Sequence, residues 1–354
     1  MRDDATQETG SLVPAPETKV RPVGFQPGWV QSIADDGPID VTVCIANWNC
    51  RELLRACLQS LVDFPQGIRV EVIVVDNGST DGAPEMIREF PEVRLIRNSE
   101  NLGFSKANNQ AAAIARGRYL LFLNNDTEVP AFTLRKLVVY AERHPEIGML
   151  GPRLCDPTGR PQISYRRLPT AAALMHRTLW FRWTGLLKPA YRRYRRQTFD
   201  PDAGGPVEAL MGAAVLLPRT VFQSCGGWDE GYAFGVEDID LSLRVGRSHR
   251  VVYLPQIEIT HHGRVSSRQN VGFTEPNLAV GFVRFLRRRG TPRPVVFAYK
   301  LAVTCDTPLR LVGHCAILVW RKLKRRPAKA ARTALTVRGL WHFLRSGMRK
   351  FWRA

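Results

Sequence analysis

Short apolar runs alternate with helical segments through the first third of the chain, and this alternation constrains the fold more than any other feature. The apolar runs cover residues 41–46, 70–75, 93–96 and 119–123, and the first two are rich in β-branched residues. Apolar residues at helical spacing mark the segments between them, at 52–61, 83–90 and 106–115. Strands that alternate with helices in this way predict a mostly parallel sheet flanked by helices. The expected fold class is therefore α/β.

Composition divides the chain of 354 residues into three parts. Residues 1–39 are rich in Pro, Gly and acidic residues and contain no apolar stretch, so we expect a disordered leader there. The α/β domain is expected over 40–270, interrupted at about 153–206 by an insertion in which arginines mix with aromatic residues. Residues 271–354 are expected to form a basic, helical C-terminal extension.

The chain is strongly basic. It carries 51 Lys and Arg against 32 Asp and Glu, which gives a net charge of +19, and much of the excess follows Arg284. Such a charge suits an acidic partner, which can be nucleic acid, an anionic membrane surface or a phosphorylated substrate. The seven cysteines are odd in number and lack the spacing of a metal site, so we expect reduced thiols in a cytoplasmic protein.

Two segments of the extension bear on membrane binding. Residues 295–320 are apolar overall, so they could be taken for a membrane-spanning helix. Polar residues and a proline interrupt them, namely Lys300, Asp306, Pro308, Arg310 and His314. A spanning helix is therefore not expected. Near the C-terminus an apolar face lies opposite an arginine face at helical spacing: Val337, Leu340, Trp341, Leu344, Met348, Phe351 and Trp352 against Arg338, Arg345, Arg349 and Arg353. This pattern is typical either of a helix in the membrane interface or of a final helix that packs on the domain.

Polar side chains follow three of the predicted strands where each strand ends. These ends read Asn47-Trp48-Asn49, Asp76-Asn77-Gly78-Ser79 and Asn124-Asn125-Asp126. Ligands of open α/β sheets bind beyond the carboxyl ends of the strands, so these residues are candidate ligand contacts. A carboxylate there suits Mg²⁺ or Mn²⁺, although an isolated Asp more often caps a helix or turn.

Two later motifs add acids and histidines. Glu237-Asp238-Ile239-Asp240 places three acids at the start of a predicted helix, where Asp238 or Asp240 could simply cap the helix. A glycine-rich aromatic loop at 226–235 precedes them. His261-His262 follows the last predicted strand, and a histidine in that place can share a metal ion with a carboxylate.

In this order the motifs resemble those of the family 2 glycosyltransferases, in particular the bacterial rhamnosyltransferase-like branch. The resemblance extends over about residues 41–267. The matching stretches are Val75–Gly82, Asn101–Asn109, Leu123–Val129, Met211–Ala213, Gly226–Glu230, Glu237–Leu241 and His261–Gly263. The resemblance implies a GT-A nucleotide-sugar-binding fold, with the insertion on the acceptor side.

The resemblance also implies a role for individual residues. Asp238 matches the catalytic base, with Glu237 beside it, and Asp126 and His261 match ligands of a divalent metal, Mg²⁺ or Mn²⁺. Asn124 stands where the metal motif of the family, Asp-x-Asp, has its first acid. The implied acceptor contacts are Trp228, Asp229 and Glu230. The implied donor contacts are Ala46, Asn47, Asn49, Asp76, Asn77, Ser79, Asn101, Lys106, Asn124, Asn125 and Gly212.

The function implied is that of an inverting glycosyltransferase. Its donor would be a nucleotide-diphosphate sugar, with rhamnose as the first sugar to try. The acceptor would be a glycan or lipid-linked glycan of the cell envelope. The enzyme would sit peripherally at the cytoplasmic face of an anionic membrane.

Two alternatives stay open from the sequence. One is a basic nucleic-acid-binding protein, which leaves the acidic motifs unexplained, so no specific nucleic-acid partner is expected. The other is a catalytically inactive relative, because Asn124 replaces an acid. A dehydrogenase or P-loop enzyme is disfavoured because both glycine-rich phosphate motifs are missing from the sequence.

Overall fold

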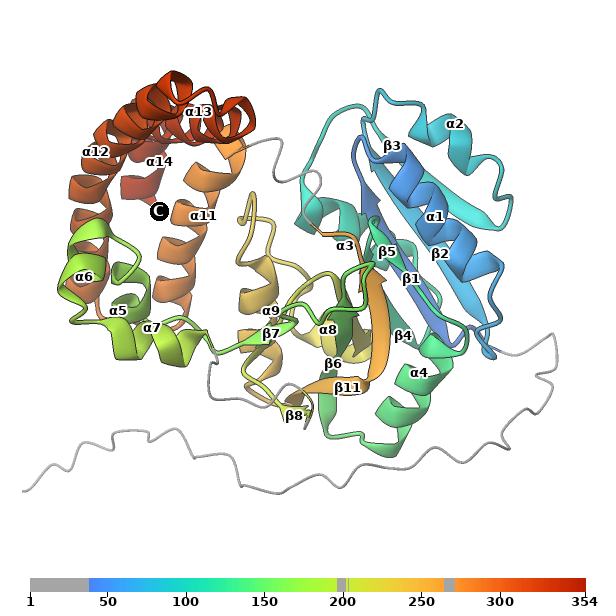
Figure 1. Ribbon diagram of the computed structural model, residues 1–354. Coiled ribbons are helices and arrows are strands. Elements are labelled where there is room, and N and C mark those ends of the chain that lie inside the picture. The colour runs from blue at the N-terminus through green and yellow to red at the C-terminus, as the bar shows by residue number, and fades with distance from the viewer. Residues whose placement is uncertain (1–37, 196–201, 203, 264–270) are drawn as a thin grey trace, which may run out of the picture. The chain divides into compact units, whose positions relative to one another are not determined.

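The computed structural model describes residues 38–195, 202, 204–263 and 271–354 (Figure 1). The predicted leader at 1–39 lies outside the described residues, apart from 38 and 39. The first half alternates strands and helices as expected: β1 (Val41–Asn47), α1 (Arg51–Val62), β2 (Val70–Asn77), α2 (Ala83–Ile87), β3 (Val93–Asn98), α3 (Phe104–Ile114), β4 (Tyr119–Asn124), β5 (Thr127–Glu128), α4 (Thr133–Arg143) and β6 (Ile147–Cys155).

The second half is less regular. The insertion contains β7 (Tyr165–Arg166), α5 (Ala171–Met175), α6 (Leu179–Thr184), α7 (Lys188–Tyr194) and β8 (Gly205–Pro206). The domain resumes with β9 (Ala209–Leu210), β10 (Ala214–Pro218), α8 (Arg219–Ser224), α9 (Glu237–Val245) and β11 (Arg250–His261). The C-terminal part is helical: α11 (Val271–Arg288), α12 (Arg293–Leu323), α13 (Pro327–His342), a π-helical turn η1 (Phe343–Gly347) and α14 (Met348–Arg353).

Nine of the described strands form a mixed sheet in the order β3-β2-β1-β4-β10-β6-β11-β5, with β8 beside β11, and β7 and β9 form a separate two-stranded sheet. The four N-terminal strands β1 to β4 pair in parallel, and β11 pairs in parallel with β6. Strand β10 runs antiparallel to both of its neighbours, β4 and β6. Strand β10 therefore brings the segment just before it to the carboxyl end of β4.

Both faces of the sheet are covered, which explains why its strands are apolar without alternation. One face of β1 packs on α1, α2 and α4 through side chains such as Leu54, Met86 and Leu137. The other face packs on α3, α8 and α9 through side chains such as Ala107, Phe222 and Leu241. The strand ends are then the part of the sheet that is left for ligands.

A third core joins the C-terminal helices to the segment before α9. It contains Phe282 and Phe285 of α11, Tyr299 of α12, Val236 beside α9, and Phe351 of α14. Phe351 is completely buried, and Leu340 and Phe343 are nearly so. Much of the apolar face predicted near the C-terminus therefore packs on the protein, although Trp341 of that face is 58% exposed.

Helix α12 is a single helix of 31 residues. By length and composition alone it is long and apolar enough to cross a membrane, although the polar residues noted in the sequence still interrupt it. Two of these groups face inward. The Lys300 ammonium donates to the backbone oxygen of Trp352 at 2.8 Å, and the Asp306 carboxylate accepts from the backbone nitrogen of Leu179 at 2.6 Å. The outward face of the helix is left mainly apolar.

Candidate active site

The ends of β1, β2 and β4 are joined by amide and carboxylate side chains. Asn47 pairs in register with Asp76, and its side-chain nitrogen donates to the Asp76 carboxylate at 2.9 Å. The Asn125 side chain donates to the Asn47 oxygen at 2.7 Å. All three side chains are buried, so each group has its partner within the protein. Predicted donor-binding residues from three separate stretches of sequence thus meet at one edge of the sheet.

The loop after β2 is held in one conformation by its own polar groups. The Asp76 carboxylate accepts the backbone N–H of Ser79 at 2.9 Å, and the Ser79 hydroxyl accepts the backbone N–H of Asn49 at 2.9 Å. Gly78 has a φ of +72°, and a Cβ there would lie 3.0 Å from the Cα of Glu100. Only glycine fits this turn without displacing the neighbouring backbone.

Asp126 and His261 face each other in a way that fits a bound cation. His261 Nδ1 donates to Gln162 Oε1 at 2.8 Å, since that amide oxygen can only accept. The other ring nitrogen, Nε2, is buried without a hydrogen-bond partner and lies 3.3 Å from Asp126 Oδ1. A cation between the imidazole nitrogen and the carboxylate oxygen would satisfy both groups.

Two protein ligands suit the metal of a phosphate-binding site. Mg²⁺ is commonly held by one or two carboxylates and completed by oxygens of the substrate phosphates. Within the described part of the chain no group of three His, Cys, Asp and Glu side chains could hold a metal ion by itself. The residues present therefore fit an ion that binds together with the donor diphosphate.

Asp238 lies next to this edge through the segment that precedes β10. The backbone N–H of Gly212 donates to Asp238 Oδ2 at 3.1 Å, and the following residue, Ala213, accepts the backbone N–H of Asn124 at 2.9 Å. Asn124 is two residues from Asp126. The predicted base and the predicted metal ligand are thus separated by a short stretch of hydrogen-bonded chain. This closeness depends on the antiparallel course of β10.

Glu237 differs electrostatically from Asp238, although the two are adjacent. Burial, followed by the negative charge of Asp238, raises the pKa of Glu237 from 4.5 to about 8. One Glu237 oxygen is buried without a hydrogen-bond partner. At neutral pH Glu237 therefore retains its proton.

The backbone just before these two acids is strained. Val236 has a φ of +91°, which is unfavourable for a β-branched side chain. Its side chain is buried in the third core, and its carbonyl accepts the N–H of Asp240 at 2.8 Å. The packing of Val236 holds the turn that orients Glu237 and Asp238.

We expect Glu237→Gln to become progressively more stable than the native protein as the pH rises. The native carboxyl keeps its proton up to about pH 8, whereas the unfolded one ionises near 4.5, so between these values its contribution to stability declines. Glutamine does not titrate and keeps the shape of the protonated acid. The test is urea unfolding at pH 5 and pH 8. A difference between the two proteins that does not change with pH would contradict the shifted pKa.

The predicted acceptor contacts at 228–230 lie in three different environments. The Trp228 ring is 1% exposed and packs edge-on to Phe104 and Phe122 in the core, so it supports the loop from within. The Glu230 carboxylate accepts from the side chain of Asn109 on α3 at 2.9 Å.

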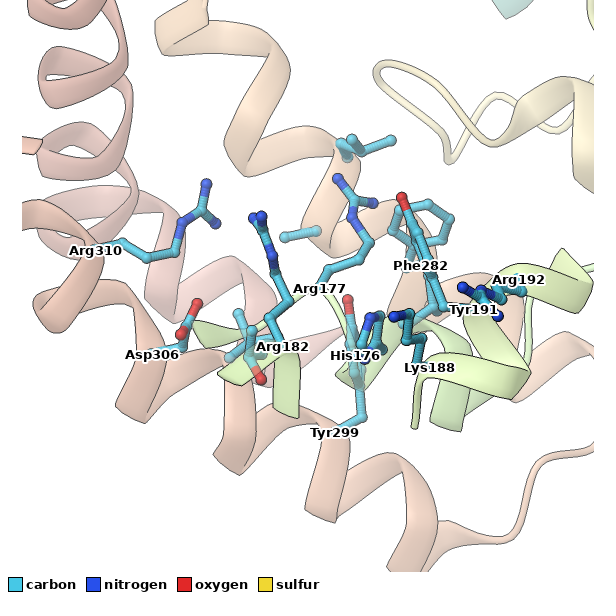
Figure 2. Close-up of a pocket in the computed structure, with 15 residues that line it drawn as sticks. His176, Arg177, Arg182, Lys188, Tyr191, Arg192, Phe282, Tyr299, Asp306 and Arg310 are labelled. Atoms are coloured by element: carbon cyan, nitrogen blue, oxygen red, sulfur yellow. The ribbon is translucent and has the colours of Figure 1, made fainter. Parts of the chain in front are cut away.

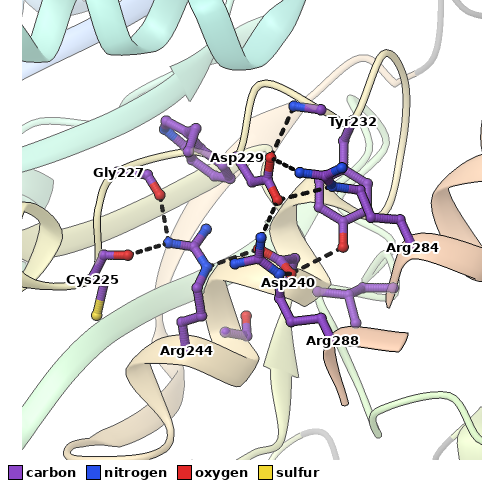
Figure 3. Close-up of polar contacts among 12 residues, drawn as sticks. Cys225, Gly227, Asp229, Tyr232, Asp240, Arg244, Arg284 and Arg288 are labelled. Atoms are coloured by element: carbon purple, nitrogen blue, oxygen red, sulfur yellow. Dashed lines mark hydrogen bonds and ion pairs between the residues drawn. The ribbon is translucent and has the colours of Figure 1, made fainter. Parts of the chain in front are cut away.

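Asp229 belongs to a network of charges that ties α11 to α9 (Figure 3). Arg284 donates to both of its carboxylate oxygens, at 3.0 and 2.8 Å. Arg288 lies between Asp229 and Asp240, with its Nε 3.1 Å from Asp240 Oδ1. Arg244 also pairs with Asp240, at 2.8 Å. Through these ion pairs, arginines of α11 position the loop that contains Asp229 and hold its carboxylate in place.

Some of the other predicted donor contacts form hydrogen bonds to the backbone, and others are exposed or partly buried. Asn77 donates to the Gly103 carbonyl at 3.3 Å, and Asn101 accepts the Gly103 N–H at 2.9 Å, so both shape the start of α3. Lys106 is exposed on α3. Ala46 pairs in register with Asn124 and is only partly buried. The roles of all these residues in binding stay predictions.

Several residues that shape the site were not selected from the sequence. Gln162 fixes His261 by two contacts, since its side-chain nitrogen also donates to the His261 carbonyl at 2.6 Å. Asn109 binds the backbone of Trp228 in both directions. Gln162 is 99 residues from its partner and Asn109 is 119 residues from its partner, so no local pattern indicates either contact.

Comparison with known proteins agrees with this geometry. The family model described as "Glycosyl transferase family 2" matches residues 42–202. The succinoglycan biosynthesis protein ExoO of Rhizobium meliloti is 33% identical over 321 residues, which cover 82% of this chain and 88% of that protein. The N-acetylglucosaminyl-diphospho-decaprenol L-rhamnosyltransferase of Mycobacterium tuberculosis is 33% identical over 207 residues, which cover 54% of this chain and 66% of that relative's length.

Two solved structures are similar in fold. The mannosyltransferase PcManGT from Pyrobaculum calidifontis, in complex with GDP-Man and Mn²⁺, superposes with a TM-score of 0.50 at 17% identity, covering 88% of this chain and 92% of that one. S. aureus TarS in complex with UDP-GlcNAc superposes with a TM-score of 0.51 at 15% identity, covering 75% of this chain and 70% of that one. These likenesses confirm the predicted GT-A fold.

Proposed function

Since this chain belongs to the family 2 glycosyltransferases, we propose that it transfers a sugar from a nucleotide-diphosphate donor to a hydroxyl group by a single inverting displacement. The observation that carries the proposal is the arrangement of three carboxylates from separate stretches of sequence, Asp76, Asp126 and Asp238, along one edge of the sheet. The hydrogen bonds from Asp76 through Asn47 to Asn125, and from Asn124 through the 212–213 segment to Asp238, support it.

Each end of this arrangement has its own task. Asp76 and the loop to Ser79 would bind the nucleoside. Asp126 and His261 would hold a divalent cation, which when bound supplies positive charge to the leaving diphosphate. Asp238 would accept the proton of the acceptor hydroxyl as that oxygen attacks the anomeric carbon from the side opposite the diphosphate. One displacement of this kind inverts the anomeric centre.

The substrates we propose follow the relatives. The mycobacterial relative is named a rhamnosyltransferase that acts on a diphospho-decaprenol-linked sugar. For this chain we propose a rhamnose donor and a lipid-linked envelope glycan as the acceptor. The exposed apolar side chains of α6 and α12, among them Trp183 at 81% and Val312 at 69%, support a peripheral position on an anionic membrane.

Donor binding in the presence of metal tests this proposal. We expect nucleotide-diphosphate sugars to raise the melting temperature of the full chain with Mn²⁺ or Mg²⁺, because a ligand of the folded state stabilises it. We expect deoxythymidine-diphosphate rhamnose to give the largest shift in the panel. If no donor raises the melting temperature in either metal, the proposed function fails.

The Asp126→Ala variant separates metal binding from nucleoside binding. It should lose most of the metal-dependent part of the shift, because His261 alone is a weak site for a hard cation. A nucleoside diphosphate without metal should bind it as it binds the native protein, because the Asp76 loop is untouched. Asp63→Ala, which changes an exposed carboxylate at the C-terminal end of α1, serves as the matched control. An unchanged metal effect in Asp126→Ala would remove Asp126 from the metal site.

A further inference from the structure

A cavity of about 580 Å³ lies between the insertion and the C-terminal helices (Figure 2). The segment from α5 to α7 forms one side, and α11 and α12 form the other. Leu174, Phe282 and Tyr299 contribute an apolar part of the lining. The rest is mainly cationic: Arg177, Arg182, Lys188, Arg192 and Arg310. This composition combines a surface for an apolar group with a surface for an anion.

Of the residues that line the cavity, one carboxylate, Asp306, offsets part of the positive charge by its electrostatic interaction with Arg310 and Arg182. Among the described residues, none of the five cationic side chains in the lining forms an ion pair. The lining holds one carboxylate, Asp306, which accepts the backbone N–H of Leu179 at 2.6 Å. Like charges gathered around one cavity repel each other, and an anion placed between them removes that repulsion. The charge therefore favours a ligand with more than one negative charge.

A buried histidine supplies a second, independent indication of a ligand. His176 lines the cavity and is 9% exposed, and its Nδ1 has no hydrogen-bond partner. Its ring lies against that of Tyr191, with the centroids 5.1 Å apart. A buried polar atom that lacks a partner is destabilising unless a ligand or water satisfies it. His176 thus offers one more polar contact to a ligand in the cavity.

The cavity is adjacent both to an exposed apolar surface and to the proposed catalytic segment. On the outer side, Trp180 and Trp183 of α6 are 66% and 81% exposed, and Leu309, beside Arg310, is 62% exposed. On the inner side, Leu278 of α11 lines the cavity and would lie 3.1 Å from a Cβ at Gly235. Gly235 is two residues before Glu237. One side chain therefore separates the cavity from the segment that carries Asp238.

We propose that this cavity binds the diphosphate of a lipid-linked acceptor, with the lipid chain on the apolar surface of α6 and α12. The inference rests on the proposed function, since it assigns a place to the acceptor of that reaction. A diphosphate carries the multiple charge that the five cations favour, and arginine is well suited to phosphate oxygens. The attached sugar would lie toward Leu278 and Asp238. A free phosphate compound would share the anionic contacts but not the apolar surface.

The test compares three probes on the full chain by titration calorimetry: farnesyl diphosphate, inorganic diphosphate and farnesol. We expect farnesyl diphosphate to bind more tightly than either of the others, because it alone uses both surfaces. The double variant Arg182→Gln/Lys188→Gln should weaken its binding by about a hundredfold, since each lost charge-assisted contact to phosphate is expected to cost about tenfold in affinity. His176→Phe should also weaken binding while keeping an aromatic ring beside Tyr191.

A matched control removes two charges elsewhere. Arg193→Gln/Arg287→Gln changes exposed arginines on α7 and α11 that do not line the cavity, and it should bind farnesyl diphosphate as the native protein does. Equal binding by the cavity variant and the native protein would overturn the proposal. So would equal affinity for inorganic diphosphate and farnesyl diphosphate, which would assign the cavity to a free anion.

Donor binding distinguishes this failure from a failure of the proposed function. The melting-temperature shift with a nucleotide-diphosphate sugar and Mn²⁺ should be the same in the native protein and in all three variants, because none of the changed residues lies at the ends of β1, β2 or β4. Loss of farnesyl diphosphate binding with a normal donor shift supports the cavity as an acceptor site. Absence of any donor shift counts against the proposed function, whatever the cavity binds.

Discussion

Asp238→Asn is expected to abolish most sugar transfer while leaving donor binding intact. Asp238 accepts the backbone N–H of Gly212 at 3.1 Å and that of Ile239 at 2.8 Å, one on each oxygen. The amide oxygen of asparagine can keep one of these bonds, and the side chain keeps its size, so the helix start should be preserved. The amide cannot take up the proton of an acceptor hydroxyl. General base catalysis typically contributes about 10²-fold to 10⁴-fold, and a loss of this order is the expected result.

The measurement is the initial rate of transfer from a radiolabelled donor, beside the thermal shift with the same donor and Mn²⁺. Asp63→Asn is the matched control, because it removes one exposed carboxylate at the C-terminal end of α1 and should leave the rate unchanged. Normal turnover in Asp238→Asn would show that another group accepts the proton. A lost thermal shift would show instead that the variant had lost the donor site.

The largest effect on stability is expected from Asp240→Ala. The Asp240 side chain is completely buried, and it accepts bonds from the Tyr232 hydroxyl at 3.0 Å and from Arg244 at 2.8 Å. Arg288 of α11 approaches it at 3.1 Å. Removal of this carboxylate leaves the largely buried Arg244 guanidinium without its counter-charge. Breaking a buried pair in this way typically costs about 3–5 kcal/mol of unfolding free energy.

Urea unfolding followed by circular dichroism measures this loss. Arg97→Ala is the control, since it removes a surface pair with Glu85 at 3.6 Å in which both side chains are more than half exposed. Exposed pairs of this kind contribute about 0–1 kcal/mol. If Asp240→Ala were no more destabilising than Arg97→Ala, the charge network of Figure 3 would not be a structural link between α11 and α9.

Much of the fold could be predicted from local sequence. The apolar runs and the helical segments between them correspond to β1 to β4 and α1 to α3. The strand-end residues Asn47, Asp76 and Asn125 were also recognisable, because the end of a parallel strand is always a place where a ligand can bind. Each of these features depends on residues that are close together in the sequence.

The direction of β10 could not be predicted in the same way. The run at 207–217 indicates a strand, but its apolar character suits parallel and antiparallel neighbours equally. The structure inserts β10 antiparallel between β4 and β6, and this course brings Gly212 and Asp238 beside Asn124. The same limit applies to the left-handed conformation of Val236, which packing in the third core stabilises and local propensity opposes.

By itself the sequence determined the alternation of strands and helices, the polar strand ends and the placement of acids at the start of α9, because those features follow from short-range periodicity and turn chemistry. Only the tertiary structure decided which acids face solvent and which form buried ion pairs. It gave Asp238 and Asp240 different surroundings although they are two residues apart. Asp238 lies beside Gly212, whereas Asp240 is enclosed by Arg244 and Arg288. It also gathered five cations around one cavity. The surroundings of these acids and the grouping of these cations depend on contacts between residues that are distant in sequence. Such contacts form only when the whole chain packs.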